Sequence, residues 1–271
     1  MTGTEVMTDQ MASRFNPTLF AYDPAQTYAW QVFDSITIAT ITWNRLEHTQ
    51  RFIDSVLRHS HLPYRLLVVD NGSDDGTVPY LRALAAAHPQ VTVVENGTNR
   101  GKMRALMQIQ ERLESGLFIY CDNDMEVLTN YWLVLLQKAF HAVRLRLGHA
   151  RVVLSPRVIN QDEYGFRYAS RHEILPIAAA ENSEPRSSYA ATNKDDPDVS
   201  AHLREEVVLG WTGFLIGGCR ALPAEIFRSL RLDGYYPLFI GGTDSFEASE
   251  FQRLGVPMAY IENGPVLRHN D

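Results

Sequence analysis

The chain has 271 residues, of which 45% are hydrophobic and 21% are charged, a composition that is ordinary for a soluble globular protein. Its formal net charge of -7 argues against a general nucleic-acid or anionic-membrane surface, because such a surface needs a basic face. No nucleic-acid partner is therefore expected. The longest uncharged stretch, 207–219, is too short for a spanning helix and is interrupted by glycines, so no transmembrane anchor is expected either.

Residues 1–34 are interpreted as an N-terminal extension. They lack the basic start and apolar core of a signal peptide. The only two cysteines, Cys121 and Cys219, lie far apart in the sequence and make neither a CxxC pair nor a disulfide framework. The cysteine pattern favours a reducing compartment, and the cytoplasm is the predicted location.

The first predicted elements form a strand–helix–strand unit. A period-two run of β-branched residues over 35–42 predicts a strand. A helical stretch with Phe52 and Val56 on one face follows, and then a buried strand over 64–70. The segment 71–77 is dense in turn-forming residues and ends in a plausible helix N-cap. A helix rich in leucine and alanine is expected after it.

The same alternation continues with a strand over 91–94, a polar loop over 96–101, a helix over 102–113 and a strand over 117–121. Strands that alternate with helices of this length predict an α/β fold with a mostly parallel sheet covered by helices on both faces. Ligands of such sheets gather at the carboxyl ends of the strands. The polar residues that end the first strands are therefore expected to converge on one rim.

The second half is less regular. A helix over 131–147 and a strand over 151–155 are predicted next. Residues 182–200 are rich in Ser, Asn, Asp, Glu and Pro, which indicates either a flexible surface loop or a lid that orders on binding. The remaining predicted elements are a strand over 207–211, helices over 223–230 and 244–254, and a closing strand over 258–261.

The most informative motif is Asp122-Asn123-Asp124, which places two carboxylates directly after a buried strand. Mg²⁺ and Mn²⁺ bind carboxylate oxygens and keep positions open for phosphate oxygens. The motif therefore predicts a divalent metal held against a diphosphate. A solvated turn is the alternative, because Asp and Asn are common after strands.

Four ordered segments, 41–45, 68–77, 99–102 and 122–124, resemble the landmarks of glycosyltransferase family 2. The resemblance covers 35–132 well and resumes over 210–269. It implies the GT-A fold, which is Rossmann-like, with a nucleoside-diphosphate-sugar donor, a metal-bound diphosphate and usually inversion at the anomeric carbon. Residues 35–132 would then form the nucleotide-sugar-binding half, and 133–271 the acceptor-binding and catalytic half of the same domain.

The resemblance implies donor contacts at the strand ends and in the loops that follow them. Hydroxyl, carboxylate and amide groups there can bind uracil or another base and its ribose. Gly101 permits close backbone approach, while Arg100, Lys102 and Arg104 could neutralise phosphate. The expected donor-binding residues are Thr40, Thr42, Asn44, Arg45, Asp70, Asn71, Gly101, Lys102, Asp122, Asn123 and Trp211.

Metal ligands follow from the same resemblance. Asp124 is expected to coordinate Mn²⁺ or Mg²⁺ directly, since the last aspartate of the motif is the principal ligand in relatives. Asp122 would meet the ribose, or the metal through water. His269 matches the position of a further ligand in many GT-A enzymes, and an imidazole would favour Mn²⁺. It could equally be an exposed residue near the chain end.

An inverting enzyme also needs a carboxylate on the acceptor side to take the acceptor's proton. The segment 239–244 resembles a family segment that contains Glu-Asp, and Asp244 is therefore the predicted general base. Thr243 stands where a glutamate usually stands, which leaves Glu247, one helical turn later, as a competing candidate. Asp244 could also simply cap a helix.

The predicted function is a metal-dependent, inverting glycosyltransferase that moves a sugar from a nucleoside-diphosphate sugar, with UDP-sugars favoured, to an acceptor hydroxyl of unknown class. One alternative is a catalytically inactive module that binds nucleotide sugars. A sugar-nucleotide nucleotidyltransferase is the less favoured alternative, because it would need a glycine-rich basic loop after the first strand and 42–45 contains no glycine.

Overall fold

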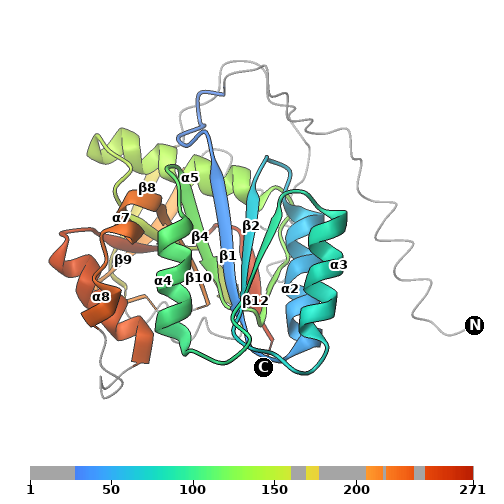
Figure 1. Cartoon of the computed structure of the whole chain (residues 1–271). Helices are drawn as coiled ribbons and strands as arrows, with labels where there is room; N and C mark the ends of the chain where they lie inside the picture. The colour runs from blue at the N-terminus through green and yellow to red at the C-terminus, as the bar shows by residue number, and fades with distance from the viewer. Residues whose placement is uncertain (1–27, 160–168, 177–205, 216–217, 235–241, 271) are drawn as a thin grey trace, which may run out of the picture.

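The computed structural model describes residues 28–159, 169–176, 206–215, 218–234 and 242–270 (Figure 1). The loop expected over 182–200 and the first 27 residues lie outside this part. Residues 28–33 of the expected extension pack against the body of the protein. Trp30 is only 3% exposed, and Gln137 Oε1 accepts hydrogen bonds from the backbone amides of Val32 and Phe33.

A nine-stranded sheet runs through the molecule in the order β3-β2-β1-β4-β10-β6-β11-β9-β8. Its strands are β1 (Ile36–Thr42), β2 (Arg65–Asp70), β3 (Val91–Glu95), β4 (Leu117–Cys121), β6 (Val153–Ser155), β8 (Ala169–Pro176), β9 (Glu206–Thr212), β10 (Cys219–Pro223) and β11 (Met258–Ile261). The expected α/β fold is present. Strands β3, β2, β1 and β4 are parallel, as are β6 and β11, whereas β10 and β9 run antiparallel to their neighbours.

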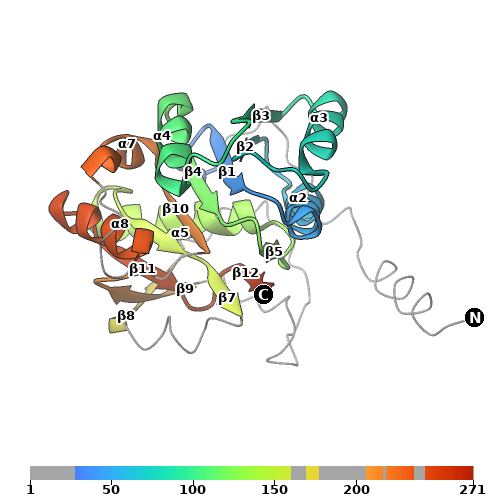
Figure 2. The ribbon, with the colours of Figure 1, turned by 60° about the horizontal axis from the view of Figure 1, so that its bottom comes forward.

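Helices cover both faces of this sheet (Figures 1 and 2). One face carries α2 (Leu46–His59), α3 (Thr77–Ala87) and α5 (Trp132–Leu147), and the other carries α4 (Lys102–Arg112), α7 (Ala224–Arg228) and α8 (Gly242–Arg253), with the 3-10 turn η3 (Leu232–Gly234). On β2, Leu66 and Val68 belong to the first core and Leu67 and Val69 to the second. Because both faces are covered, the four central residues of the strand, 66–69, are all apolar instead of alternating.

A second, three-stranded sheet has the order β5-β12-β7. Its strands β5 (Met125–Val127), β7 (Arg157–Ile159) and β12 (Val266–His269) were not predicted, because three or four residues are too few to show a period. β12 runs antiparallel to β5, with His269 opposite Met125. The C-terminal strand is thereby brought to the residues that follow β4.

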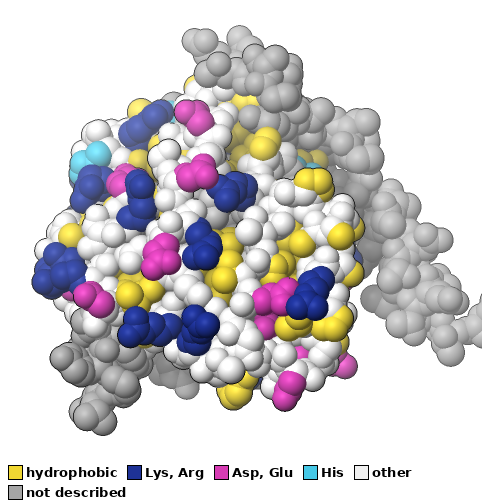
Figure 3. Space-filling view, viewed as in Figure 1, with side chains coloured by type: hydrophobic (Ala, Val, Ile, Leu, Met, Phe, Trp, Pro, Cys, Tyr) yellow, Lys and Arg dark blue, Asp and Glu magenta, His cyan; other side chains and the backbone are white. Residues whose placement is uncertain are grey.

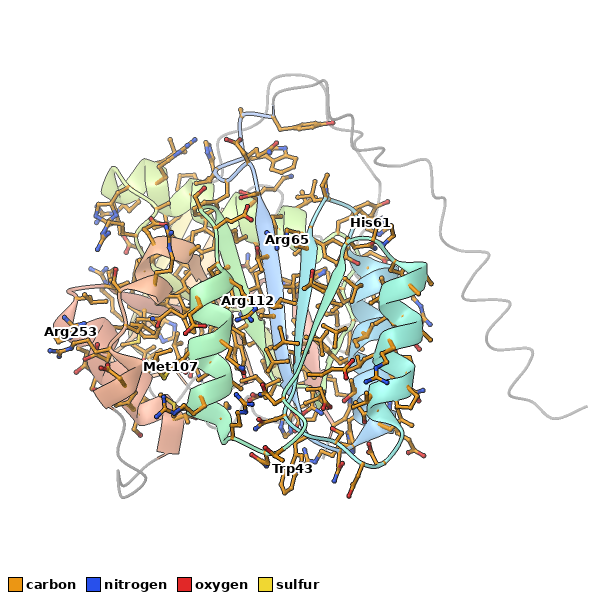
Figure 4. All side chains as sticks on the ribbon, viewed as in Figure 1. Trp43, His61, Arg65, Met107, Arg112 and Arg253 are labelled. Carbon is orange, nitrogen blue, oxygen red and sulfur yellow. The ribbon has the colours of Figure 1, made fainter. Side chains whose placement is uncertain are left out.

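The parallel strands end at one edge of the large sheet, which we call the carboxyl edge. Thr42 lies opposite Asp70, and Asp70 lies opposite Glu95. Trp43, the next residue after β1, marks this edge at the bottom of Figure 4. The expected convergence of the first strand ends on one rim is confirmed.

The two cysteines are direct neighbours in the fold, although they lie 98 positions apart in the sequence. Cys121 on β4 lies opposite Cys219 on β10, and their sulfur atoms are 3.1 Å apart. Both are buried free thiols, and burial raises the pKa of Cys121 well above its usual value. The sequence did not predict this pairing, because it depends on the antiparallel register of a strand that was not foreseen.

The surface carries mixed charge. Figure 3 shows basic and acidic side chains interspersed over the face that bears α4. Within the described residues, no helix is long and apolar enough to cross a membrane.

Candidate active site

The turn after β4 is anchored from inside. Asn123 Nδ2 donates hydrogen bonds to Thr49 Oγ1 at 3.1 Å and to Thr42 Oγ1 at 3.3 Å, and the two hydroxyl oxygens lie 2.7 Å apart. All three side chains are buried. Thr42 and Asn123 were expected to bind the donor, but the structure uses them to hold the motif against β1 and α2. Asp122 and Asp124 on either side remain partly exposed.

Asp124 has one carboxylate oxygen without a hydrogen-bond partner. Asp124 Oδ1 is buried and makes no hydrogen bond among the described residues, and His269 Nε2 faces it at 3.7 Å. Asp124 Oδ2 accepts a hydrogen bond from Arg45 Nη1 at 2.8 Å. An unsatisfied buried carboxylate oxygen is costly unless a ligand binds it. A carboxylate and an imidazole that face each other suit Mn²⁺.

These two residues fit a divalent ion as a partial ligand set. In the described part of the chain, no group of three His, Cys, Asp or Glu side chains converges to hold a metal. Two protein ligands are nevertheless enough for an ion whose other positions are filled by phosphate and water. The exposed fraction of the His269 side chain is only 16%, so His269 is not the exposed residue that the sequence left as the alternative.

Asp122 is held differently. Its Oδ1 accepts hydrogen bonds from Lys102 Nζ and from the Tyr120 hydroxyl, each at 2.9 Å. Burial pushes the pKa of Asp122 upward, but the charge and hydrogen bond of Lys102, followed by Tyr120 and Arg220, outweigh it and lower the pKa. Asp122 is therefore a carboxylate at neutral pH. Asp122 is thus paired with Lys102, whereas Asp124 is paired with Arg45.

Asp70 stabilises the turn after β2 with one of its two carboxylate oxygens. Its Oδ2 accepts hydrogen bonds from the amides of Gly72 and Ser73 at 3.0 and 3.1 Å, whereas Oδ1 is buried and has no hydrogen-bond partner among the described residues. Gly72 has φ of 87°, and a Cβ there would lie 2.5 Å from the backbone of Thr98. The close approach of these two loops therefore requires glycine.

Asn71 ties the turn after β2 to the loop 96–101. Its Oδ1 accepts hydrogen bonds from Asn96 Nδ2 at 3.1 Å and from the Arg100 amide at 3.0 Å, and its Nδ2 donates to Asn99 Oδ1 at 2.8 Å. The Gly101 amide donates to the same Asn99 oxygen. Asn71 therefore positions the loop rather than presenting its amide to a ligand. The sequence did not single out Asn96 and Asn99, although asparagines clustered in a turn indicate such a role.

The turn after β1 directs Arg45 toward the metal-ligand candidates. Asn44 and Arg45 have positive φ of 56° and 61°, a region that costs about 1 kcal/mol or more for residues other than glycine. Two hydrogen bonds fix this turn: the Asn44 amide donates to Ser73 Oγ at 2.7 Å, and Asn44 Oδ1 accepts from the Asp74 amide at 2.9 Å. Trp43 beside them is 55% exposed. An aromatic ring left in solvent at a ligand-binding edge is a candidate contact that the sequence did not reveal.

The acceptor-side candidates share one arginine. Asp244 and Glu247 lie one turn apart on α8, and both form ion pairs with Arg220 on β10. The side chains of Arg220 and Glu247 are each 4% exposed, whereas that of Asp244 is 27% exposed. Glu247 is therefore a buried counter-ion. Asp244 is the more exposed of the two carboxylates.

Two residues that were expected to bind the donor do not lie with the other candidate site residues at the carboxyl edge. Trp211 lies on β9, four strands from β4, and its indole N–H donates to Glu173 Oε2 at 2.8 Å. With neighbouring strands about 4.8 Å apart, β9 lies roughly 19 Å from β4. Thr40 is fully buried within β1, opposite Val68. Neither residue presents its side chain at the carboxyl edge.

Three solved structures share this fold. The mannosyltransferase PcManGT from Pyrobaculum calidifontis, in complex with GDP-Man and Mn²⁺, aligns with TM-score 0.56 and 21% identity over 97% of this chain and 64% of its own. GalNAc-T7 with UDP, GalNAc and Mn²⁺ aligns with TM-score 0.58 and 14% identity over 100% of this chain and 53% of its own. TarS 1-349 from S. aureus aligns with TM-score 0.55 and 12% identity over 87% of this chain and 60% of its own.

The chain thus spans between 53% and 64% of the length of these proteins, and at such low identity the likeness shows the fold, which is GT-A. Comparison with curated protein sequences gives no match. The sequence model of glycosyl transferase family 2 matches residues 37–231, which include every strand of the parallel half and the turn with the two aspartates. The chain belongs to glycosyl transferase family 2.

Proposed function

We propose that this protein is a metal-dependent glycosyltransferase that moves a sugar from a nucleoside-diphosphate sugar to an acceptor hydroxyl, with inversion at the anomeric carbon. The observation that carries the proposal is the pair of buried carboxylate oxygens, Asp70 Oδ1 and Asp124 Oδ1, that make no hydrogen bond among the described residues. Both aspartates follow or end parallel strands at the carboxyl edge. A nucleoside N–H or hydroxyl would satisfy the first oxygen, and a divalent metal the second.

Asp124 and His269 would hold Mn²⁺ or Mg²⁺, with the diphosphate completing the coordination. The bound ion supplies positive charge that stabilises the departing diphosphate. PcManGT and GalNAc-T7 were solved with Mn²⁺, which supports Mn²⁺ as the first ion to test. Their nucleotides are GDP-Man and UDP respectively, so UDP-sugars, our favoured donors, are tested beside GDP-mannose.

Asp244 would act as the general base. The acceptor oxygen forms a bond to the anomeric carbon while the bond from that carbon to the diphosphate oxygen breaks, and the diphosphate leaves with the electron pair. The acceptor's proton passes to the Asp244 carboxylate, which lies on the acceptor side in this proposal. A single displacement of this kind inverts the anomeric carbon.

The test is a thermal-shift screen of UDP, GDP and dTDP in Mn²⁺ or in EDTA. A ligand that binds only the folded protein raises its melting temperature, so we expect a nucleotide to do so in Mn²⁺ and to lose the effect in EDTA. Asp124→Asn should lose the effect in Mn²⁺ as well. Glu114→Gln, which changes an exposed carboxylate paired with Arg65, is the matched control and should behave as wild type.

Nucleotide binding is then followed by turnover, measured as release of UDP or GDP from the corresponding nucleotide sugar. A protein that binds no nucleotide in Mn²⁺ would contradict the proposed function. Binding without any release of nucleoside diphosphate, tested with water and with a panel of sugar and lipid hydroxyls as acceptors, would instead favour the inactive binding module.

A further inference from the structure

Arg220 occupies a buried position between the donor side and the acceptor side of the site. It lies on β10 opposite Tyr120 on β4, and the Tyr120 hydroxyl donates to Asp122. On its other side the guanidinium forms ion pairs with Asp244 and Glu247. One side chain therefore contacts the general-base candidate while its charge also helps to lower the pKa of Asp122.

The two carboxylates that Arg220 contacts differ in burial. The Glu247 side chain is as buried as Arg220 itself, whereas Asp244 is partly exposed. A buried carboxylate with a buried arginine makes a fixed anchor, because separating the two would leave an unpaired charge in the core. Arg220 is thus held by Glu247, and its other terminal nitrogen, Nη2, donates to Asp244 Oδ1.

This contact fixes the orientation of Asp244. An arginine presents its N–H groups as a rigid planar fork, so a guanidinium anchored at one terminal nitrogen points the other in a fixed direction. With Oδ1 bound to Arg220, the plane of the Asp244 carboxylate is fixed relative to β10. Reacting groups that are misplaced by about 1 Å can lose two powers of ten in rate.

We propose that Arg220 is a positioning residue, which holds the Asp244 carboxylate in the orientation needed to deprotonate the acceptor and is itself held by the buried Glu247. This inference rests on the proposed function, since it assigns a role within that reaction. It also assigns Glu247 the role of an anchor, although the sequence left it as a competing base.

The rival explanation is that Arg220 only neutralises Glu247 in the core. Arg220→Gln alone does not distinguish the two explanations. It leaves Glu247 buried without its partner, and the variant can unfold for that reason. The double variant Arg220→Gln/Glu247→Gln removes both buried charges together. If Arg220 is only a counter-ion, this neutral pair should restore wild-type turnover.

The measurement is release of UDP or GDP from its nucleotide sugar in Mn²⁺, with water as the acceptor, resolved into kcat and KM. For the double variant we expect kcat to fall ten- to a hundredfold while KM for the donor stays within about twofold, because in this proposal Asp244 and Arg220 act on the acceptor and not on donor binding. Arg231→Gln is the matched control. Arg231 also pairs with a glutamate of α8, Glu250, but outside the site, and kcat should stay within about twofold of wild type.

Wild-type kcat in a folded double variant would overturn the role of Arg220 and leave the proposed function standing. A wild-type protein that neither binds nor cleaves the nucleotide sugars would overturn the proposed function and this role with it. Should circular dichroism show that the double variant is unfolded, Arg220→Lys takes its place. A lysine keeps the charge but not the two-pronged geometry, so kcat should again fall at constant KM, and unchanged kcat would contradict the proposal.

Discussion

Arg45 Nη1 lies 2.8 Å from Asp124 Oδ2, so the principal metal-ligand candidate is paired with a cation of the protein itself. The Arg45 side chain is 58% exposed, and exposed ion pairs contribute about 1 kcal/mol or less. A divalent ion bound at Oδ1 would repel this guanidinium on the other oxygen of the same carboxylate, and the guanidinium can be displaced from Oδ2 at little cost. Once displaced, the guanidinium would lie close to the diphosphate that the metal binds.

Removal of Arg45 should therefore change metal and donor binding in opposite directions. We expect Arg45→Ala to bind Mn²⁺ alone about two- to fivefold more tightly, since up to about 1 kcal/mol of competition is lost. Binding of UDP or GDP in saturating Mn²⁺ should weaken, because a phosphate contact is lost. Electron paramagnetic resonance of unbound Mn²⁺ gives the first affinity, and calorimetry gives the second.

Arg51→Ala, on the exposed side of α2, is the control for the change in net charge and should leave both affinities near wild type. If Arg45→Ala weakens Mn²⁺ binding, or leaves it unchanged, then Arg45 does not compete for the metal position.

His269 should contribute to metal selectivity. Because imidazole suits Mn²⁺ better than Mg²⁺, which prefers oxygen ligands, we expect His269→Ala to lower Mn²⁺ affinity roughly tenfold and Mg²⁺ affinity much less. Calorimetric titration with each ion measures this difference. His88→Ala, at the end of α3, controls for the loss of a histidine elsewhere. Equal losses for both ions would indicate that His269 supports Asp124 without binding the metal.

The parallel half of the fold could be predicted from the sequence, because its strands are apolar or β-branched runs that alternate with helical stretches long enough to show their own period. The same pattern placed Asp70 and Asp122 at strand ends. It could not tell which polar residues face inward: Thr42 and Asn123 occur in the expected positions but bond to each other. That distinction depends on which side of a turn faces α2, and no local pattern records it.

The acceptor side was harder to predict, because it depends on short antiparallel strands. Arg220 lies in β10, whose sequence Cys-Arg-Ala-Leu-Pro is not the apolar or β-branched run that marks the equally short β3 and β4. Its contact with α8 joins residues 24 positions apart. The likeness to the family identified Asp244, but it did not show that Glu247 is buried. Only the tertiary packing of α8 against the sheet separates these two carboxylates.

Asp244→Asn should lose turnover without losing donor binding. A positioned general base contributes roughly two to four powers of ten to the rate, and we expect kcat for nucleoside-diphosphate release to fall by about that factor. The affinity for UDP or GDP in Mn²⁺, measured by calorimetry, should stay near wild type. Near-normal turnover in Asp244→Asn, with a comparable loss in Glu247→Gln, would move the base role to Glu247.

Glu250 should stabilise the fold in a pH-dependent manner. It accepts hydrogen bonds from Arg253 and Arg231, and these bonds, with that of Arg253 the strongest, lower its pKa from 4.5 to about 2 against the opposing effect of burial. Because the folded-state pKa is depressed, the stabilisation is fully present above about pH 4.5 and is lost as the pH falls toward 2.

The depression of the Glu250 pKa corresponds to at most about 3 kcal/mol at neutral pH, and solvent screening of the partly exposed Arg231 and Arg253 reduces this amount. Urea unfolding at a series of pH values should therefore show Glu250→Gln less stable than wild type by up to this amount at pH 7, with a difference that shrinks below pH 4.5. Glu225→Gln, an exposed glutamate on α7, should show no such convergence. A free-energy difference between Glu250→Gln and wild type that stays constant from pH 7 to pH 3 would contradict the linkage, because it would mean that the loss comes from packing and not from the ionised carboxylate.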